Sequence, residues 1–242
     1  MFSEAAVASE LLERRGVFYV VLKTLVTRVS LLIWRPRVEG RENLPQRGPV
    51  ILAANHLSFV DSMLIPIVAP RRVSFLAKAE YFETPGFKGR LMRAFFTAIG
   101  AVAVRRGEHR AARDSLDQAL AVINSGNAFV IYPEGTRSLD GRLYRGKVGV
   151  GWLALKSGAP IVPVGIEGTQ RLLPVGAKVP RLAPISVRFG EPIDATKVEF
   201  AGDAVAENPK ARRAVTDVVT AEIQKLSHQE YAGIYNERPA EV

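Results

Sequence analysis

Short apolar runs alternate along most of the chain with longer segments in which apolar positions recur every three or four residues. The short runs have the length of buried strands, and the longer segments have helical periodicity. The runs typical of strands cover residues 49–54, 73–78, 100–106, 128–132, 160–166 and 184–190. The helical patterns cover residues 59–69, 89–99, 108–126, 149–158 and 208–227. Strands separated by helices indicate an α/β fold, with a mixed, largely parallel sheet flanked by helices.

The segment VFYVVLKTLVTRVSLLIW, residues 17–34, precedes this pattern and is almost continuously apolar. It is nearly long enough to span a bilayer, but Lys23 and Arg28 lie inside it. On a helix these charges share one arc, and most apolar side chains occupy the opposite arc. We expect an amphipathic helix that docks on a membrane, within an N-terminal region of residues 1–34 that precedes a single domain of residues 35–242. The alternative is a helix packed on the protein's own core. No small-residue cleavage site follows, which argues against a signal peptide.

Composition limits the partners and the chemistry. The 242 residues carry a net charge of +9 and give a pI near 10, which indicates an anionic partner. Nucleic acid is disfavoured because no basic stripe with interleaved aromatic residues is present. The chain has no cysteine, which excludes disulfides, thiolate metal sites and a cysteine nucleophile. Anionic lipid and phosphorylated metabolites remain as candidate anionic partners.

A histidine and an aspartate stand five positions apart in NHLSFVD, residues 55–61, directly after the predicted strand PVILAA. On a continuous helix this separation turns the side chains about 140° apart, so they meet only if His56 lies in a loop and Asp61 in the next helix. The predicted strand-to-helix break allows that arrangement. An aspartate that accepts a hydrogen bond from one ring nitrogen leaves the other nitrogen free as a base. His56 is therefore a candidate general base oriented by Asp61, with coincidence as the alternative for this motif alone.

A second polar segment, YPEGTRS at residues 132–138, follows the predicted strand AFVIY. The ends of parallel strands meet at one edge of a sheet, so we expect both segments to be loops on the same rim. Gly135 permits a close backbone approach, Thr136 offers a hydroxyl donor, and Arg137 has the planar fork that suits phosphate. The segment predicts a phosphate site, and an ordinary turn with surface charges is the alternative.

Other candidate motifs add little. Arg105 and Arg106 end the predicted strand GAVAVRR and would add cations to the same rim, unless they are only a solvated strand end. GRLYRGKV and GVGWLA approach nucleotide-binding patterns, but no apolar strand precedes either, and Val148 stands where a P-loop needs Ser or Thr. No G-x-S-x-G elbow occurs, which argues against a serine esterase. His109 and His228 lie in polar helical contexts that indicate no metal site.

With both loops identified, the chain resembles the lysophosphatidic acid acyltransferase (PlsC-like) family of glycerophospholipid acyltransferases. Four blocks match in order over residues 35–195. NHLSFVD is similar to the family's N-H-x-S-x-x-D block, and GAVAVRR resembles a second block that ends in arginine. YPEGTRS is similar to F-P-E-G-T-R-S, with Tyr132 in place of Phe, and GAPIVPVGI resembles a strand block centred on Pro163. Four ordered motifs are far more specific than any one alone.

The resemblance implies that residues 35–242 are an acyltransferase catalytic domain. His56, oriented by Asp61, would remove a proton from the free hydroxyl of 1-acyl-glycerol-3-phosphate. That oxygen would attack the thioester of acyl-CoA or an acyl carrier protein, which makes phosphatidic acid for phospholipid synthesis. No cofactor and no metal are implied. The residues implied to bind the phosphate or glycerol of the acceptor are Arg105, Arg106, Glu134, Gly135, Thr136 and Arg137.

Glu134 carries a negative charge, which is unfavourable in a set of residues implied to bind a phosphate. Glu134 would lie beside a phosphate, so we expect it to orient Arg137 or to bind hydroxyls of the acceptor instead. Lys147 follows closely in the sequence and is a further candidate cation. Glycerol-3-phosphate, another lysophospholipid or a glycolipid would use similar motifs. A catalytically silent phospholipid-binding protein is the non-enzymatic alternative.

The expected partners are membrane phospholipid and the acyl donor, with no nucleic acid and no metal. An acyl chain is insoluble, and acyl donors are cytosolic, so the resemblance implies peripheral or monotopic attachment at the cytoplasmic face of the cell membrane. The basic surplus would favour anionic lipid by about 1 kcal/mol per surface cation.

Overall fold

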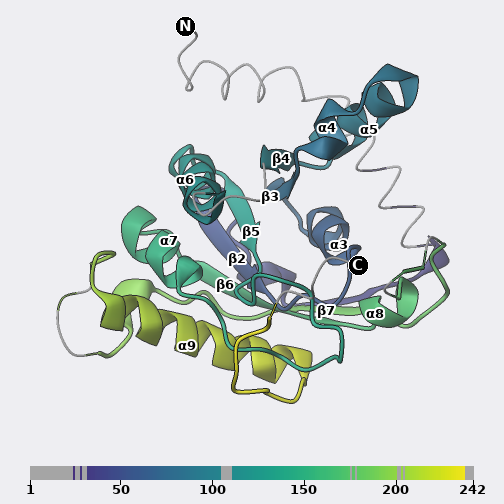
Figure 1. The fold of residues 1–242 in the computed structure, drawn as a ribbon. Helices are drawn as coiled ribbons and strands as arrows, with labels where there is room; N and C mark the ends of the chain where they lie inside the picture. Colours follow the sequence, from purple (N-terminus) through teal and green to yellow (C-terminus); the bar gives the residue numbers. More distant parts are fainter. Residues whose placement is uncertain are drawn as a thin grey trace, which may run out of the picture.

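The structure is a computed structural model that describes residues 24, 28, 32–104, 111–174, 176–177, 179–200, 203 and 205–237. In this part of the chain one sheet has the strand order β1-β7-β6-β2-β5-β3-β4 (Figure 1). The strands are β1 (Arg37–Glu39), β2 (Val50–Ala54), β3 (Val73–Lys78), β4 (Ala101–Val104), β5 (Ala128–Ile131), β6 (Ile161–Glu167) and β7 (Ser186–Phe189). The helices are α3 (Asp61–Val68), α4 (Glu80–Glu83), α5 (Gly86–Ala98), α6 (Ala111–Asn124), α7 (Gly149–Ser157), α8 (Thr169–Leu172) and α9 (Pro209–Ser227). Single 3-10 turns cover Arg41–Asn43 and Ala195–Lys197.

The sheet is mixed and largely parallel, as predicted. β2 pairs in parallel with β5 on one side and with β6 on the other. β7 pairs antiparallel with β6, and β1 pairs in parallel with β7, so β7 and β1 run opposite to the other strands. Every residue of β2 is buried, which is typical of a central strand covered by helices on both faces.

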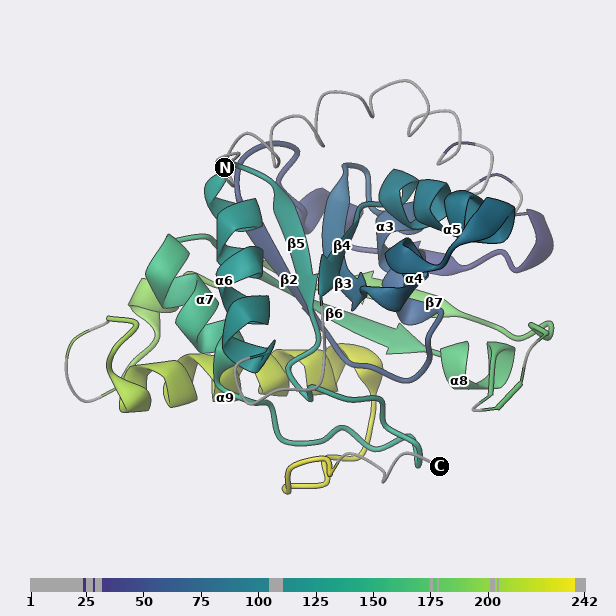
Figure 2. The same ribbon diagram turned by 45° about the horizontal axis from the view of Figure 1, so that its top comes forward.

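Helices cover both faces of the sheet because alternate residues of β2 point to opposite sides. Leu52 belongs to a core cluster with residues of α3 and α5, including Ile65 and Phe96. Ile51 belongs to a second cluster with residues of α6, α7 and α9, including Val219. Figure 2 shows α6, α7 and α9 on one side of the sheet and α3, α4 and α5 on the other.

Close packing of α9 on the sheet explains a small residue in the GAPIVPVGI block. Gly165 of β6 lies directly against the backbone and side chain of Leu226 in α9, so a Cβ atom at this position would collide with both. α9 begins at Pro209, and the side chain of Asn208 accepts hydrogen bonds from the N–H groups of Lys210 and Ala211. This cap is typical of a helix N-terminus.

The predicted strands and helices are all present, and most boundaries shift by one to three residues. Three short elements were not predicted. β1 and α8 have three and four residues, and α4 also has four, so none is long enough to establish a hydrophobic period. β1 is an edge strand whose charged residues Arg37 and Glu39 form an ion pair with each other.

Two predicted features fall largely or wholly outside the described residues. The amphipathic segment 17–34 is described only at residues 24, 28 and 32–34, where Leu32 and Ile33 are exposed. Arg105 and Arg106 are not described. Within the described residues, no helix combines the length and the apolar character needed to cross a membrane.

Candidate active site

The two motif loops meet at one rim of the sheet, as predicted. β2 and β5 are parallel neighbours, so the loops that follow Ala54 and Ile131 leave the same edge. The backbone N–H of Ser138 donates to the carbonyl oxygen of His56 at 2.7 Å. A direct hydrogen bond therefore joins NHLSFVD to YPEGTRS.

His56 and Asp61 form a hydrogen-bonded pair. His56 lies in the loop after β2, and Asp61 is the first residue of α3. The ring atom Nδ1 is 2.9 Å from Oδ2 of Asp61. A carboxylate can only accept, so the ring donates through Nδ1, and Nε2 is the nitrogen available to take a proton.

Asp61 is fixed by the backbone around it. Its side chain is 0% exposed, and Oδ2 also accepts hydrogen bonds from the N–H groups of Leu57 and Ser58, each at 2.7 Å. These bonds fold the loop into a tight turn at the start of α3, where a negative charge is favoured by the helix dipole. The other carboxylate oxygen of Asp61 is buried without a hydrogen-bond partner. Three donors thus converge on one oxygen, which restricts the orientation of the imidazole.

Tyr132 supports the imidazole from the second loop. The two rings stack with centroids 4.1 Å apart and planes inclined by 18°. Burial raises the pKa of the Tyr132 phenol well above its usual value, and the charge of Asp61 raises it further. The phenol therefore stays neutral and acts as a flat packing surface. Its position in the motif was noted from the sequence, but its contact with His56 was not predicted.

Glu134 does not contact Arg137 in the way the sequence indicated. The side chain is 1% exposed, Oε1 accepts the backbone N–H of His56 at 2.9 Å, and Oε2 accepts the N–H of Tyr144 at 3.1 Å. Both oxygens are thereby occupied by backbone donors beneath the rim. Burial raises the pKa of the Glu134 carboxyl to about 7, although the two N–H groups lower it in part. These contacts fit a residue that positions His56 better than one that touches an acceptor.

The YPEGTRS turn contains one cationic residue, Arg137, and lies against a second, Lys147. Gly135 has a φ of 77°, and a Cβ atom there would lie 3.0 Å from Nζ of Lys147. The backbone N–H of Lys147 donates to the carbonyl oxygen of Pro133 at 2.8 Å, which ties this lysine to the turn. Arg137 is exposed and Thr136 is half-buried in the same turn. Lys147 thus lies beside Gly135, and Arg137 is two residues further along the same turn; cationic side chains of these types suit a phosphate.

Asn55, the first residue of the NHLSFVD block, ties three segments together. Its buried amide exchanges hydrogen bonds with the backbone of Ile166 in β6 at 2.7 and 2.8 Å. The same amide donates to Oε1 of Gln229 at 2.7 Å, and Nε2 of Gln229 donates to the carbonyl oxygen of Gly141 at 2.7 Å. Gln229 therefore links the loop after β2 to the loop after β5. No local pattern in the sequence indicated this residue.

The tail after α9 also holds the second loop. Leu143 forms a parallel bridge with Tyr231, and Arg145 donates its N–H to the carbonyl oxygen of Ile234 at 2.8 Å. The side chain of Asn236 donates to the carbonyl oxygen of Arg137 at 3.1 Å. The backbone that carries Arg137 is thus supported by residues about a hundred positions away.

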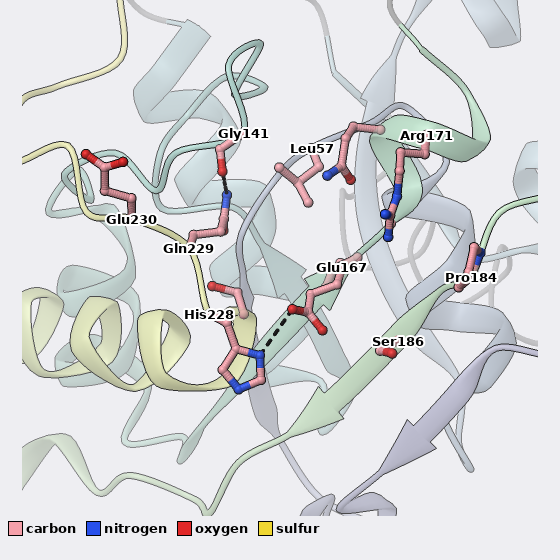
Figure 3. Close-up of a pocket in the computed structure, with 13 residues that line it drawn as sticks. Leu57, Gly141, Glu167, Arg171, Pro184, Ser186, His228, Gln229 and Glu230 are labelled. Carbon is pink, nitrogen blue, oxygen red and sulfur yellow. Dashed lines mark hydrogen bonds and ion pairs between the residues drawn. The ribbon is translucent and has the colours of Figure 1, made fainter.

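A cavity of about 400 Å³ lies beside these loops, at the end of β6 and next to the C-terminal end of α9 (Figure 3). Leu57 lines it, but His56 does not. Glu167 and His228 form an ion pair at its edge, with 3.1 Å between Oε1 and Nδ1. Arg171 and Glu230 complete a lining with both signs of charge, which does not favour a phosphate.

The serine of the NHLSFVD motif has its hydroxyl engaged by the backbone. The hydroxyl of Ser58, the nearest serine in the motif, donates to the carbonyl oxygen of Leu173 at 3.0 Å. Across the described residues, no group of three or more His, Cys, Asp or Glu side chains could hold a metal ion. An imidazole that donates through Nδ1 has the geometry to take a proton at Nε2 from a hydroxyl of a bound molecule.

Comparison with known proteins shows the family of this chain. A family model described as Acyltransferase matches residues 35–167, which is more than half of the chain. The chain is 28% identical over 192 residues to a chloroplastic 1-acyl-sn-glycerol-3-phosphate acyltransferase of Brassica napus, covering 78% of this chain and 54% of that protein. It is 33% identical over 170 residues to a 1-acyl-sn-glycerol-3-phosphate acyltransferase of Limnanthes douglasii, covering 68% of this chain and 58% of that protein. The chain therefore spans a little more than half the length of these relatives.

A solved structure shares the fold. The crystal structure of the 1-acyl-sn-glycerophosphate acyltransferase PlsC from Thermotoga maritima matches with a TM-score of 0.63 and 26% sequence identity, covering 91% of this chain and 88% of that one. The family match includes the NHLSFVD and YPEGTRS loops, both of which lie between residues 35 and 167. This chain belongs to the acyltransferase family.

Proposed function

We propose that this protein transfers a fatty acyl group from acyl-CoA, or from an acyl carrier protein, to the free hydroxyl of 1-acyl-glycerol-3-phosphate. The observation that carries the proposal is the His56–Asp61 pair, which shares a rim with the Gly135 turn and its two cations. The names of the relatives support this acceptor over glycerol-3-phosphate, another lysophospholipid or a glycolipid.

The proposed reaction is a direct transfer. The acceptor phosphate binds Arg137 and Lys147, which places the hydroxyl near Nε2 of His56. Nε2 takes the hydroxyl proton as the oxygen attacks the thioester carbonyl carbon. The tetrahedral intermediate then collapses, the C–S bond breaks, and the imidazolium returns its proton to the departing thiolate. Asp61 holds the ring and stabilises the positive charge that forms on it. No cofactor takes part.

The protein is proposed to work while attached to the cytoplasmic face of a membrane. Its acceptor and product are lipids, and its net charge of +9 favours an anionic surface. The polar and apolar arcs of the 17–34 segment support attachment without a span. The alternative is a catalytically inactive protein that binds the same phospholipids without turnover.

Labelled acyl-CoA offered with a panel of acceptors tests the proposal. We expect turnover with 1-acyl-glycerol-3-phosphate and a loss of roughly 10²–10⁴-fold in His56→Ala, because a positioned general base contributes about that much. His228→Asn is the matched control, since His228 belongs to neither motif loop and Asn tolerates its positive φ of 55°. If the activity of His56→Ala stayed within threefold of wild type, His56 would not be the general base. Turnover with another acceptor and not with 1-acyl-glycerol-3-phosphate would show that the proposed acceptor is wrong.

A further inference from the structure

Helix α5 exposes large apolar side chains on its outer face. Phe87 is 82% exposed and Leu91 is 63% exposed. They stand four positions apart, so they lie on one face of the helix, and the exposed Ala94 continues that face for another turn. The opposite face is occupied by Phe96 and other core residues. α5 is therefore apolar on both sides.

Positive charge flanks this outer face. Lys88 and Arg90 are exposed, and at about 100° per residue they fall on either side of the line from Phe87 to Leu91. Arg93 is a third exposed cation, and α5 itself contains no acidic residue. The acidic side chains of this hairpin, Glu80 and Glu83, belong to the neighbouring helix α4.

The inner face of α5 is in contact with the candidate active site through aromatic rings. Phe96 stacks on Tyr81 of α4 with ring centroids 4.7 Å apart. Tyr81 meets Phe59 edge-on, with centroids 6.1 Å apart. Phe59 belongs to the NHLSFVD loop, two residues before Asp61. A surface that binds α5 would therefore lie close to the loop that carries His56.

We propose that the outer face of α5, formed by Phe87, Leu91 and Ala94, is a bilayer contact distinct from the 17–34 segment. The apolar side chains enter the acyl region, and Lys88 and Arg90 reach the phosphates of anionic lipids. This contact deepens the proposed function, because it brings the His56 rim to the membrane in which a lipid acceptor lies.

Two features favour a lipid surface over a protein partner. The apolar stripe has only two large side chains, whereas a stable protein interface buries about 800 Å² on each partner. Cations on both flanks of an apolar stripe match the order of phosphates above acyl chains, with the long basic side chains extended toward the headgroups.

The absence of native cysteine allows a direct test. Leu91→Cys in the full chain would carry an environment-sensitive fluorophore, and Val218→Cys on α9 is the control. Val218 is also an exposed apolar residue on a helix, and α9 runs along the far side of the molecule from α5 (Figure 1). Vesicles of phosphatidylcholine with phosphatidylglycerol should shift the emission of the label at position 91 to the blue and leave the label at position 218 unchanged. An equal shift at both positions, or no shift at position 91, would overturn the proposal.

Unlabelled variants measure the strength of the contact by vesicle sedimentation. Phe87→Glu with Leu91→Glu should lower partitioning by roughly tenfold or more, at an unchanged melting temperature, because both side chains are exposed. Lys88→Gln and Arg90→Gln should each lower partitioning by about fivefold on vesicles with phosphatidylglycerol, but not on pure phosphatidylcholine. Wild-type partitioning of the double glutamate variant would contradict the assignment.

The remaining outcomes identify other occupants and also reject the bilayer. A label at position 91 that shifts with protein concentration in the absence of vesicles would mean that a second copy covers this face. A label that is blue-shifted at every dilution would mean that another segment of this chain covers it. Acyl transfer is measured separately on a short-chain soluble acceptor. If that transfer is absent while the lipid-dependent shift persists, the proposed function fails and the bilayer contact stands.

Discussion

The carboxylate of Glu134 accepts the backbone N–H of His56 at 2.9 Å across 78 positions of sequence. This bond joins the YPEGTRS segment to the backbone of the candidate base. Because the second oxygen of Glu134 accepts the N–H of Tyr144, one buried side chain holds both loops in register. The two motifs of the family thus act as one structural unit.

Replacing Glu134 by Ala should weaken catalysis without a selective loss of acceptor binding. Two part-buried N–H groups would lose their partner, at a cost of up to about 1–3 kcal/mol each in the free energy of unfolding. The His56 loop would then be less well positioned, so we expect kcat to fall more than the acceptor KM rises. Steady-state kinetics measure this division, and Glu134→Gln should recover part of kcat because its amide keeps one acceptor. A change confined to the acceptor KM would instead make Glu134 a substrate ligand.

The titration of Glu134 predicts a pH dependence of stability. Burial raises the pKa of this carboxyl to about 7 from an ordinary value of 4.5. Between these values the native state binds a proton that the unfolded state has released. The contribution of Glu134 to the free energy of unfolding is therefore full below pH 4.5 and decreases as the pH rises through 7, by at most about 1.4 kcal/mol per pH unit.

Urea denaturation at pH 5 and pH 7.5 measures this effect. Glu134→Gln does not titrate, so the stability advantage of the wild type over this variant should shrink at the higher pH. An advantage that grows with pH would show that the two N–H groups outweigh burial and lower the pKa instead.

Asp61→Asn should lower kcat by roughly 10²–10⁴-fold with little change in either KM. The amide cannot stabilise the imidazolium as a carboxylate does, and it can hold the ring in the wrong tautomer. Asp217→Asn, which alters an exposed ion pair on α9, is the control for loss of one negative charge. If Asp61→Asn kept more than a third of wild-type kcat, orientation of His56 by this carboxylate would not matter for turnover.

Arg137→Gln and Lys147→Gln should each raise the acceptor KM by roughly tenfold or more. A charge-assisted hydrogen bond contributes about 1.5–3 kcal/mol. Lys147 lies beside Gly135, and Arg137 belongs to the same turn. The donor KM should stay near the wild-type value. Arg142→Gln is the matched control, because Arg142 lies nearby but is paired with Asp140 at 2.7 Å. Separate titration of donor and acceptor distinguishes the outcomes. A selective rise in the donor KM would show that Arg137 and Lys147 do not bind the acceptor phosphate.

The sequence alone determined the features that depend on local order. The alternation of short apolar runs with helical patterns predicted the mixed, largely parallel sheet, because strand and helix periods are properties of neighbouring residues. The approach of His56 to Asp61 followed from a strand-to-helix break within five residues. The meeting of the two motif loops followed from the rule that parallel strands end at one edge.

Only the tertiary structure decided the contacts between distant segments. Gln229 reaches Asn55 across 174 positions, and Glu134 braces the backbone of His56 instead of meeting Arg137. Hydrophobic periodicity contains no information about such pairs, because they depend on how helices and loops are arranged around the sheet. The exposure of α5 is a similar case. Phe87 and Leu91 fit a buried face as well as an exposed one in the sequence, and only the position of α5 against α4 leaves them on the surface.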